Sequence, residues 1–241
     1  MASLRYDKSI TAYPSEAGLS RRFTIDDEVT NDAVSALRVL ARDEQVDPSR
    51  VYVLGHSLGG MMAPRIALRA EKTLAGVVLM AAPAESILDN GIQQTIYLAS
   101  VRHTPEATLQ AQLKSARDEQ ALLASHLHGP LPAEGYAGLP QSWWMSVHVY
   151  DQVTAAKALR VPMLIVQGGS DFQVSPRANF IRWQQAFPDD RRVTFKEYPG
   201  LSHLFAPAGN PPTPDDYAKP SSMDAQVIRD IARWINTHPA S

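Results

Sequence analysis

The stretch VYVLGHSLGG, residues 51–60, constrains the fold of this chain more than any other. Residues 51–54 are β-branched or apolar and predict a short buried strand, while residues 58–70 have helical character. Gly-x-Ser-x-Gly between a strand and a helix places its serine on a strained turn, where the helix N-terminus stabilises negative charge. A glycine-rich phosphate turn is the competing interpretation, but no Lys-Ser/Thr pair supports it. We therefore predict that Ser57 is a nucleophile and that Gly55 and Gly59 leave room where the backbone passes close to itself.

The rest of the chain alternates in the same way between apolar strands and amphipathic helices. Strands are expected at residues 75–80, 161–166 and 193–198, and helices at 24–42, 176–187 and 221–238, the first opened by a Thr24–Asp27 capping box. Such alternation predicts one α/β domain over residues 1–241 with a mostly parallel sheet and right-handed crossovers. Residues 84–150 interrupt the pattern and are expected to form a cap-like insertion, helical and polar at 104–126 and rich in Pro, Gly and Trp at 131–145.

A serine hydroxyl is a poor nucleophile at neutral pH and needs a histidine base oriented by a carboxylate. Asp171 follows the predicted strand at 161–166, and His203 follows the one at 193–198. Asp151 is a rival acid, yet it precedes the strand that Asp171 follows. Of the seven histidines, His203 alone follows a core strand; the others are His56, His103, His126, His128, His148 and His238. We predict a Ser57, Asp171, His203 triad.

Composition excludes several other classes of function. The 23 basic and 25 acidic residues give a net charge of -2, which predicts no attraction to nucleic acid or to an anionic membrane. The absence of cysteine rules out disulfides, thiolate metal sites and cysteine nucleophiles. No run of about 18 apolar residues and no signal-peptide core occur, so we expect a cytoplasmic protein with a small, neutral partner.

The segments GHSLGG, QGGSDFQV and YPGLSHLF make the chain resemble α/β-hydrolases of the esterase group related to dienelactone hydrolases and prolyl-oligopeptidase-like enzymes. The resemblance implies an acyl-enzyme formed on Ser57 without metal or organic cofactor, and a backbone N–H of Leu58 as oxyanion donor. It favours short to medium acyl esters as substrates, and leaves peptide, thioester or lactone hydrolysis open. Candidate pocket residues are His56, Met61, Trp143, Trp144, Phe172, Leu204 and Phe205, although the two tryptophans are equally explained as an anchor for the insertion.

The chain departs from this family at its beginning. The HG-type loop that supplies a second oxyanion donor is absent, and residues 4–7 resemble the fourth strand of the family, so the sheet is expected to start three strands late. A gap should then lie beside residues 51–54, closed by pairing with residues 4–7, by a new path of the N-terminal segment, or by a second copy of the chain. We expect a homodimer, formed by segment exchange or strand-edge pairing.

Loss of that loop also leaves two questions about activity. Tyr6 is a candidate replacement donor, against the simpler interpretation of a packing tyrosine. The alternative to an enzyme is a shortened relic that keeps the triad but acts as a binding or assembly protein.

Overall fold

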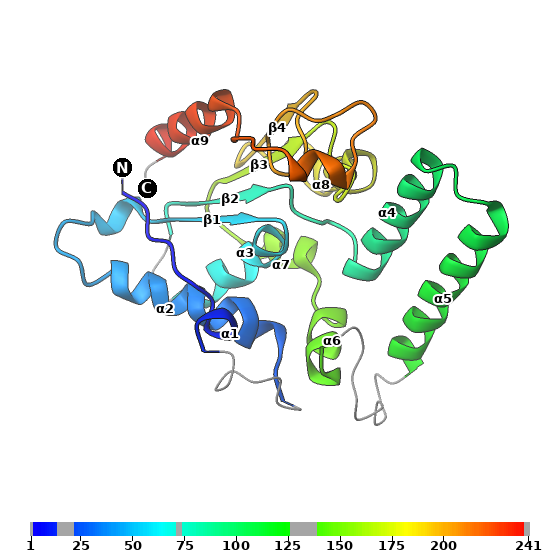
Figure 1. The fold of residues 1–241 in the computed structure, drawn as a ribbon. Helices are drawn as coiled ribbons and strands as arrows, with labels where there is room; N and C mark the ends of the chain where they lie inside the picture. The colour runs from blue at the N-terminus through cyan, green and yellow to red at the C-terminus, as the bar shows by residue number, and fades with distance from the viewer. Residues whose placement is uncertain (1, 14–21, 71–73, 126–138, 239–241) are drawn as a thin grey trace.

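A computed structural model describes residues 2–13, 22–70, 74–125 and 139–238 of the chain. These residues contain a four-stranded parallel sheet in the order β1 (Tyr52–His56), β2 (Gly76–Met80), β3 (Met163–Gly168), β4 (Val193–Tyr198) (Figure 1). Val77 pairs with both Val53 and Met163, which fixes the register across the first three strands. All four strands predicted between residues 51 and 198 are confirmed, and their carboxyl ends meet at one edge of the sheet.

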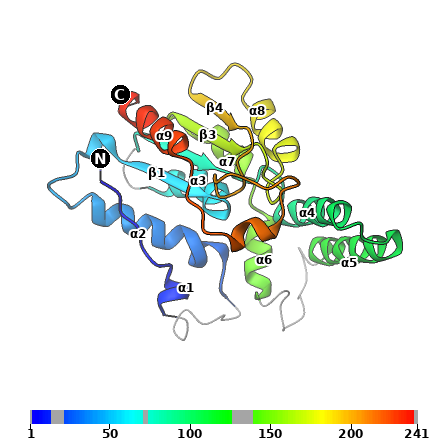
Figure 2. The ribbon, with the colours of Figure 1, turned by 45° about the horizontal axis from the view of Figure 1, so that its top comes forward.

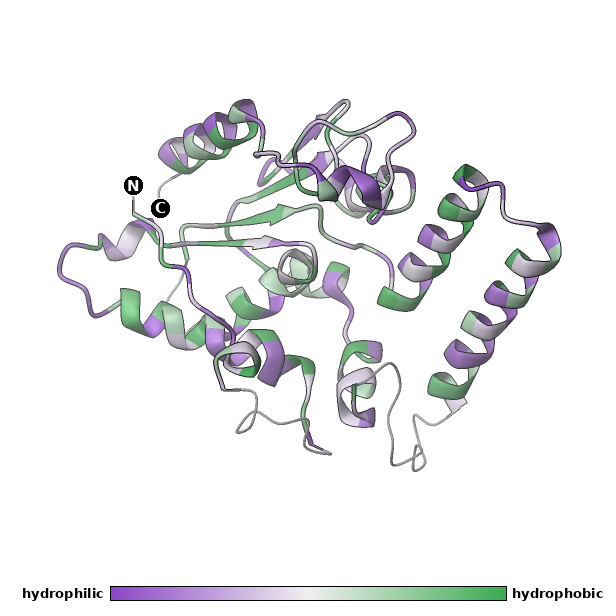
Figure 3. Ribbon diagram, in the orientation of Figure 1, coloured by the Kyte–Doolittle hydropathy of each residue, from purple (hydrophilic) through white to green (hydrophobic). Residues whose placement is uncertain are grey.

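Helices cover both faces of the sheet because successive side chains of the two central strands point to opposite sides. One face packs against α3 (Leu58–Arg69), α7 (Gln152–Ala158) and α8 (Ile181–Ala186), and the other against α9 (Ala225–Thr237) (Figures 1 and 2). The strand residues on the first face are Val77, Leu79, Met163 and Ile165, and those on the second are Val78, Met80, Leu164 and Val166. The central strands β2 and β3 are mostly coloured as hydrophobic in Figure 3.

Further helical segments occur outside residues 84–150. They are α1 (Ser9–Ala12), α2 (Asn31–Leu40) with a π-helical turn before it (Asp26–Thr30), a second π-helical turn (Pro176–Phe180) leading into α8, and 3₁₀ turns at Pro48–Arg50 and Pro214–Ala218. The predicted capping box is present, since the Thr24 N–H donates to the Asp27 carboxylate at 2.9 Å and the Asp27 N–H donates to Thr24 Oγ1 at 3.4 Å. No helix in the described ranges is long and apolar enough to cross a membrane.

The insertion is helical, with α4 (Ile87–Val101), α5 (Glu106–Ser125) and α6 (Gln141–His148). Figures 1 and 2 both show α4 and α5 side by side, beyond the carboxyl edge of the sheet. α5 confirms the helix predicted at 104–126, whereas α4 was not predicted, and much of the segment predicted at 131–145 lies outside the described residues.

The prediction of a strand at residues 4–7 is wrong. Residues 2–8 have no regular structure, and the chain is tied instead to the helical layer by two polar contacts. Lys8 forms an ion pair with Glu28 at 3.0 Å, and the Ser9 N–H and hydroxyl both donate to the Asp32 carboxylate at 2.6 Å. Pairing of residues 4–7 with the β1 strand is therefore excluded, and β1 is an edge strand of the sheet that the described residues form.

Candidate active site

The turn between β1 and α3 holds Ser57 in a strained backbone conformation, with φ 55° and ψ −120°. Two hydrogen bonds fix it there: the Ser57 N–H donates to the Met80 carbonyl and the Met61 N–H donates to the Ser57 carbonyl, both at 2.9 Å. A positive φ is unfavourable for residues other than glycine, so it marks a conformation that the surrounding structure imposes. Ser57 thus lies on the strained turn between a strand and a helix that the sequence motif predicts, and its role as nucleophile stays a prediction.

Close packing at this turn requires one of the two predicted glycines. A Cβ at Gly55 would lie 2.1 Å from the Gly59 carbonyl oxygen, so only glycine fits. A Cβ at Gly59 would meet nothing within 4 Å, and the steric role predicted for Gly59 is wrong. Gly60 has that role instead, since a Cβ there would lie 2.9 Å from the Ala82 Cβ.

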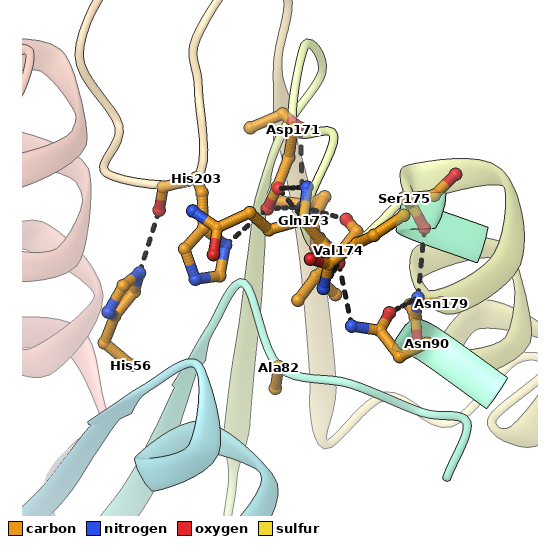
Figure 4. Close-up of polar contacts among 12 residues, drawn as sticks. His56, Ala82, Asn90, Asp171, Gln173, Val174, Ser175, Asn179 and His203 are labelled. Atoms are coloured by element: carbon orange, nitrogen blue, oxygen red, sulfur yellow. Dashed lines mark hydrogen bonds and ion pairs between the residues drawn. The ribbon is translucent and has the colours of Figure 1, made fainter. Parts of the chain in front are cut away.

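Asp171 lies in the turn after β3, and its carboxylate is completely buried. One oxygen, Oδ1, accepts the backbone N–H groups of Gln173 and Val174 at 2.8 and 2.9 Å. The other, Oδ2, accepts the Gln167 side-chain amide at 2.9 Å and lies 2.8 Å from His203 Nδ1 (Figure 4). Four donors therefore fix the direction of the carboxylate.

His203 lies in the turn after β4, nine-tenths or more buried. A carboxylate oxygen accepts here, so His203 Nδ1 donates its N–H to Asp171 Oδ2 and Nε2 is left to act as the base. We call the turn after β3 that holds Asp171 the acid turn and the turn after β4 that holds His203 the base turn. Two backbone hydrogen bonds join them: the Ser170 N–H donates to the Leu201 carbonyl at 2.9 Å, and the Gly169 N–H donates to the Tyr198 carbonyl at 2.8 Å. The structure thus brings together Asp171 and His203 as the sequence predicts.

The two turns can approach each other because β3 ends in a glycine. A Cβ on Gly168 would lie 2.3 Å from the Ser202 carbonyl oxygen and 2.6 Å from that of Leu201. Any side chain at this position would therefore push the base turn away from the acid turn.

His56 connects the turn between β1 and α3 that holds Ser57, here called the elbow, to the base turn. Its Nε2 lies 2.8 Å from the His203 carbonyl oxygen, and the two imidazole rings lie 4.6 Å apart between centroids (Figure 4). A carbonyl only accepts, so His56 carries its proton on Nε2. Burial, reinforced by the neighbouring His203, lowers the pKa of His56 and keeps it neutral. Among the described residues no hydrogen bond joins the Ser57 hydroxyl to the His203 ring, and such contacts often tighten only when substrate is bound.

Leu58 supplies the first amide of α3, and helix geometry leaves such an N–H without an intrahelical acceptor. This amide is next to Ser57 in sequence, and its role as an oxyanion donor stays a prediction. Tyr6 is half exposed and lies near Asp32. Partial burial, together with the Asp32 carboxylate, raises the pKa of the Tyr6 phenol. A packing position matches this placement, and the oxyanion role of Tyr6 stays a prediction.

Most of the predicted pocket residues are buried in the core. Trp143 and Trp144 pack with the helices of the N-terminal half, and the Trp143 indole N–H donates to Glu28 at 2.7 Å, which anchors the insertion to the body. Of the set, Leu204 alone has a side chain that is well exposed, at 44 %. Met61 and Phe205 lie in the core, and Phe172 stacks between Tyr97 and Tyr217. Their contact with a substrate stays a prediction.

The rival acid Asp151 caps α7 instead, accepting the Thr154 N–H at 2.9 Å. That backbone hydrogen bond is the main reason why the pKa of Asp151 is lowered.

Sequence reasoning missed a set of amide side chains around the acid turn. Asn90 of α4 donates to the Gln173 carbonyl at 2.8 Å, and Asn179 donates to the Asn90 side-chain oxygen at 3.1 Å (Figure 4). Gln167 is the last but one residue of β3 and directly follows the apolar run predicted as a strand at residues 161–166. A polar residue at the end of such an apolar run is the signal that could have identified it.

Comparison with known proteins gives the chain relatives in sequence and in fold. A sequence profile of the family described as "Serine aminopeptidase, S33" matches residues 15–206. The chain is 35% identical over 214 residues to Esterase EstD of Thermotoga maritima, an alignment that covers 88% of this chain and 48% of that protein. The chain therefore spans about half the length of this curated relative.

Among solved structures, the proline iminopeptidase of Mycobacterium smegmatis is similar in fold. It superimposes with a TM-score of 0.53 at 19% identity, covering 92% of this chain and 75% of that one. At this level of identity the likeness concerns the fold alone.

Proposed function

Since the chain belongs to the serine aminopeptidase S33 family of α/β-hydrolases, we propose that it is a serine hydrolase that cleaves carboxylic esters of short to medium acyl groups. The observation that carries this proposal is the contact between Asp171 and His203, which His56 joins to the turn that holds Ser57 in a strained conformation. The four donors that hold the buried Asp171 carboxylate favour an active enzyme over a shortened relic that acts as a binding or assembly protein.

Each residue has a defined step in the proposed reaction. His203 Nε2 removes the Ser57 hydroxyl proton as Oγ attacks the acyl carbonyl, and the Leu58 N–H stabilises the oxyanion that forms. His203 then passes the proton to the leaving alkoxide, which departs as the alcohol. Water, activated by the same nitrogen, hydrolyses the acyl-enzyme, and Asp171 stabilises the imidazolium in both halves of the reaction.

Ester rather than peptide cleavage is favoured by the relative named an esterase, whereas the family description names an aminopeptidase. The motifs GHSLGG, QGGSDFQV and YPGLSHLF further support a place near the dienelactone hydrolase and prolyl-oligopeptidase-like esterases. A direct comparison of p-nitrophenyl butyrate with alanine p-nitroanilide separates the two activities. We expect turnover of the ester only, and preferential turnover of the anilide contradicts the proposal.

The nucleophile is tested by Ser57→Ala beside the wild type, with a fluorophosphonate probe as a second readout. We expect the variant to lose both ester turnover and labelling, and mass spectrometry to place the adduct on Ser57. Equal rates in the two proteins, at the background level, would leave the chain without the proposed activity.

We further propose that two copies of the chain pair through the outer edge of β1. The Val51 carbonyl and the Ser57 N–H both bond toward β2, so the backbone groups of Tyr52, Leu54 and His56 point the other way. Within the described ranges these outward groups have no backbone partner, and the Leu54 side chain is 50% exposed. Such an edge readily pairs with another strand, and two identical edges can pair antiparallel about a twofold axis.

Sedimentation velocity at micromolar concentration tests the dimer. We expect a dimeric wild type and a monomeric Leu54→Lys variant, because a lysine on an edge strand opposes pairing. Ile96→Lys, an equally apolar and exposed position on α4, is the matched control and should stay dimeric. A monomeric wild type overturns the proposal. A cytoplasmic location stays a prediction.

A further inference from the structure

Gln167 is an uncharged polar side chain completely surrounded by protein, 2 % exposed near the end of β3. Its Nε2 has three neighbours within hydrogen-bonding distance: Asp171 Oδ2 at 2.9 Å, the Val174 carbonyl at 3.1 Å and the Gly168 carbonyl at 3.4 Å. All three are acceptors, which fixes the orientation of the amide with its nitrogen toward them. Gln167 thus contacts the acid turn at both of its ends, at the carbonyl groups of Gly168 and Val174.

The oxygen that Gln167 reaches is the one that faces the base. Asp171 Oδ2 receives both the Gln167 amide and His203 Nδ1, whereas Oδ1 is held only by backbone N–H groups of the turn. The backbone donors on Oδ1 restrain one oxygen of the carboxylate. The Gln167 amide adds a donor on Oδ2 itself, and so restrains the oxygen that also accepts from His203.

We infer that Gln167 is a positioning residue for the proposed hydrolase, which holds Asp171 Oδ2 in line with His203 Nδ1. It touches neither substrate nor the reacting atoms, and it acts through Asp171. This inference rests on the proposed function for its kinetic readout.

The first test removes the donor with little change in volume, in the variant Gln167→Leu. We expect kcat on p-nitrophenyl butyrate to fall about ten- to a hundredfold with KM unchanged, from the loss of a hydrogen bond to a charged group. The matched control is Gln152→Leu. Gln152 is also buried and also donates to two backbone carbonyls, those of Pro83 and Glu85, but it contacts no triad residue. The control should lose stability and keep kcat.

A second variant, Gln167→Glu, gives a signature that a merely structural role cannot. Two buried carboxyl groups about 2.9 Å apart cannot both be ionised, so they share one proton. With that proton the introduced acid still donates to Asp171, and activity is retained. When the proton is lost as pH rises, the two anions repel and Asp171 is displaced. We expect a descending limb at about pH 7 to 9 that the wild type and Gln152→Glu lack.

A third readout needs no turnover. In protein labelled with ¹⁵N-histidine, the Nδ1–H of His203, assigned by its loss in His203→Gln, should shift in Gln167→Leu and stay in place in Gln152→Leu. An unmoved resonance, or a Gln167→Leu variant with the wild-type kcat, overturns the inference. A wild type without esterase activity but with the shifted resonance overturns the proposed reaction and leaves the positioning role standing.

Discussion

Replacing Gly55 by alanine should damage the elbow far more than the same change at Gly59, four residues along the same motif. At Gly55 the new methyl group would lie 2.1 Å from the Gly59 carbonyl oxygen, 2.4 Å from its carbon and 2.7 Å from the Gly60 nitrogen. Carbon atoms in proteins pack no closer than about 3.5 Å, so β1 and α3 must separate by about 1 Å. The neighbouring atoms are backbone and cannot rotate away.

The magnitude follows from this geometry. Overpacking a filled site costs about 1 to 3 kcal/mol, and backbone that cannot move aside places Gly55→Ala at the upper end. For a chain of 241 residues, about 3 kcal/mol lowers Tm by about 6 to 12 °C. A displacement of about 1 Å in a catalytic group costs about a hundredfold in rate, so kcat should fall by at least that factor in the molecules that still fold.

Gly59→Ala is the matched control because a Cβ there would meet nothing within 4 Å. Gly59 lies inside α3, where alanine is favoured over glycine by about 0.5 to 1 kcal/mol, and Tm should rise by about 1 to 4 °C. Calorimetry and ester turnover on both variants test the pair. If the two substitutions change Tm equally, the steric account of this elbow is wrong.

Three further predictions concern His56, Gly168 and Tyr6. His56→Gln should flatten the pH dependence of the free energy of unfolding. Burial lowers the pKa of folded His56 below its unfolded value, so its contribution to stability is fully present above about pH 6.5 and is lost as pH falls through the lowered pKa of the folded state. Urea unfolding at pH 5 and pH 7 measures this change. Gly168→Ala should separate the acid and base turns and lower kcat by about a hundredfold, whereas Gly91→Ala, in an open helical position, should leave kcat unchanged. Tyr6→Phe should leave kcat unchanged because the phenol lies near Asp32, and a hundredfold loss on one ester would instead assign it the oxyanion role.

The parts of this fold that the sequence predicts are those that local pattern determines. Three of the strands are apolar runs, and the fourth, at residues 193–198, alternates between apolar and polar residues. The Gly-x-Ser-x-Gly motif lies between a strand and a helix, and Asp171 and His203 each follow a strand in the required order. Helix α4 was missed because Ile87–Val101 combines apolar residues with Asp89, Asn90 and Gly91 and has no clear face. The short segment at residues 4–7 alternates like a strand, but long-range contacts of Lys8 and Ser9 with the helical layer decide its path.

The fine structure of the site was beyond prediction for a related reason. Gly55 and Gly59 are equivalent in the motif, and only the crossing of β1 and α3 in space shows that the first is confined and the second is not. Gln167, Asn90 and Asn179 meet near Asp171 from three separate parts of the chain. Spacing along the sequence carries no information about such contacts.

Position in the sheet links Ser57, the proposed nucleophile, to the proposed dimer. Ser57 follows the strand whose outer edge is open, and the outward-facing residues Leu54 and His56 lie three positions and one position before it. His56 also contacts the His203 carbonyl, so its backbone faces the open edge while its side chain supports the base. A strand that pairs with this edge would restrain both the elbow and His56, and dissociation would release them. Specific activity should therefore rise with protein concentration through the dimerisation range in the wild type, and should be independent of concentration in Leu54→Lys. A wild type that dimerises with constant specific activity would separate assembly from catalysis.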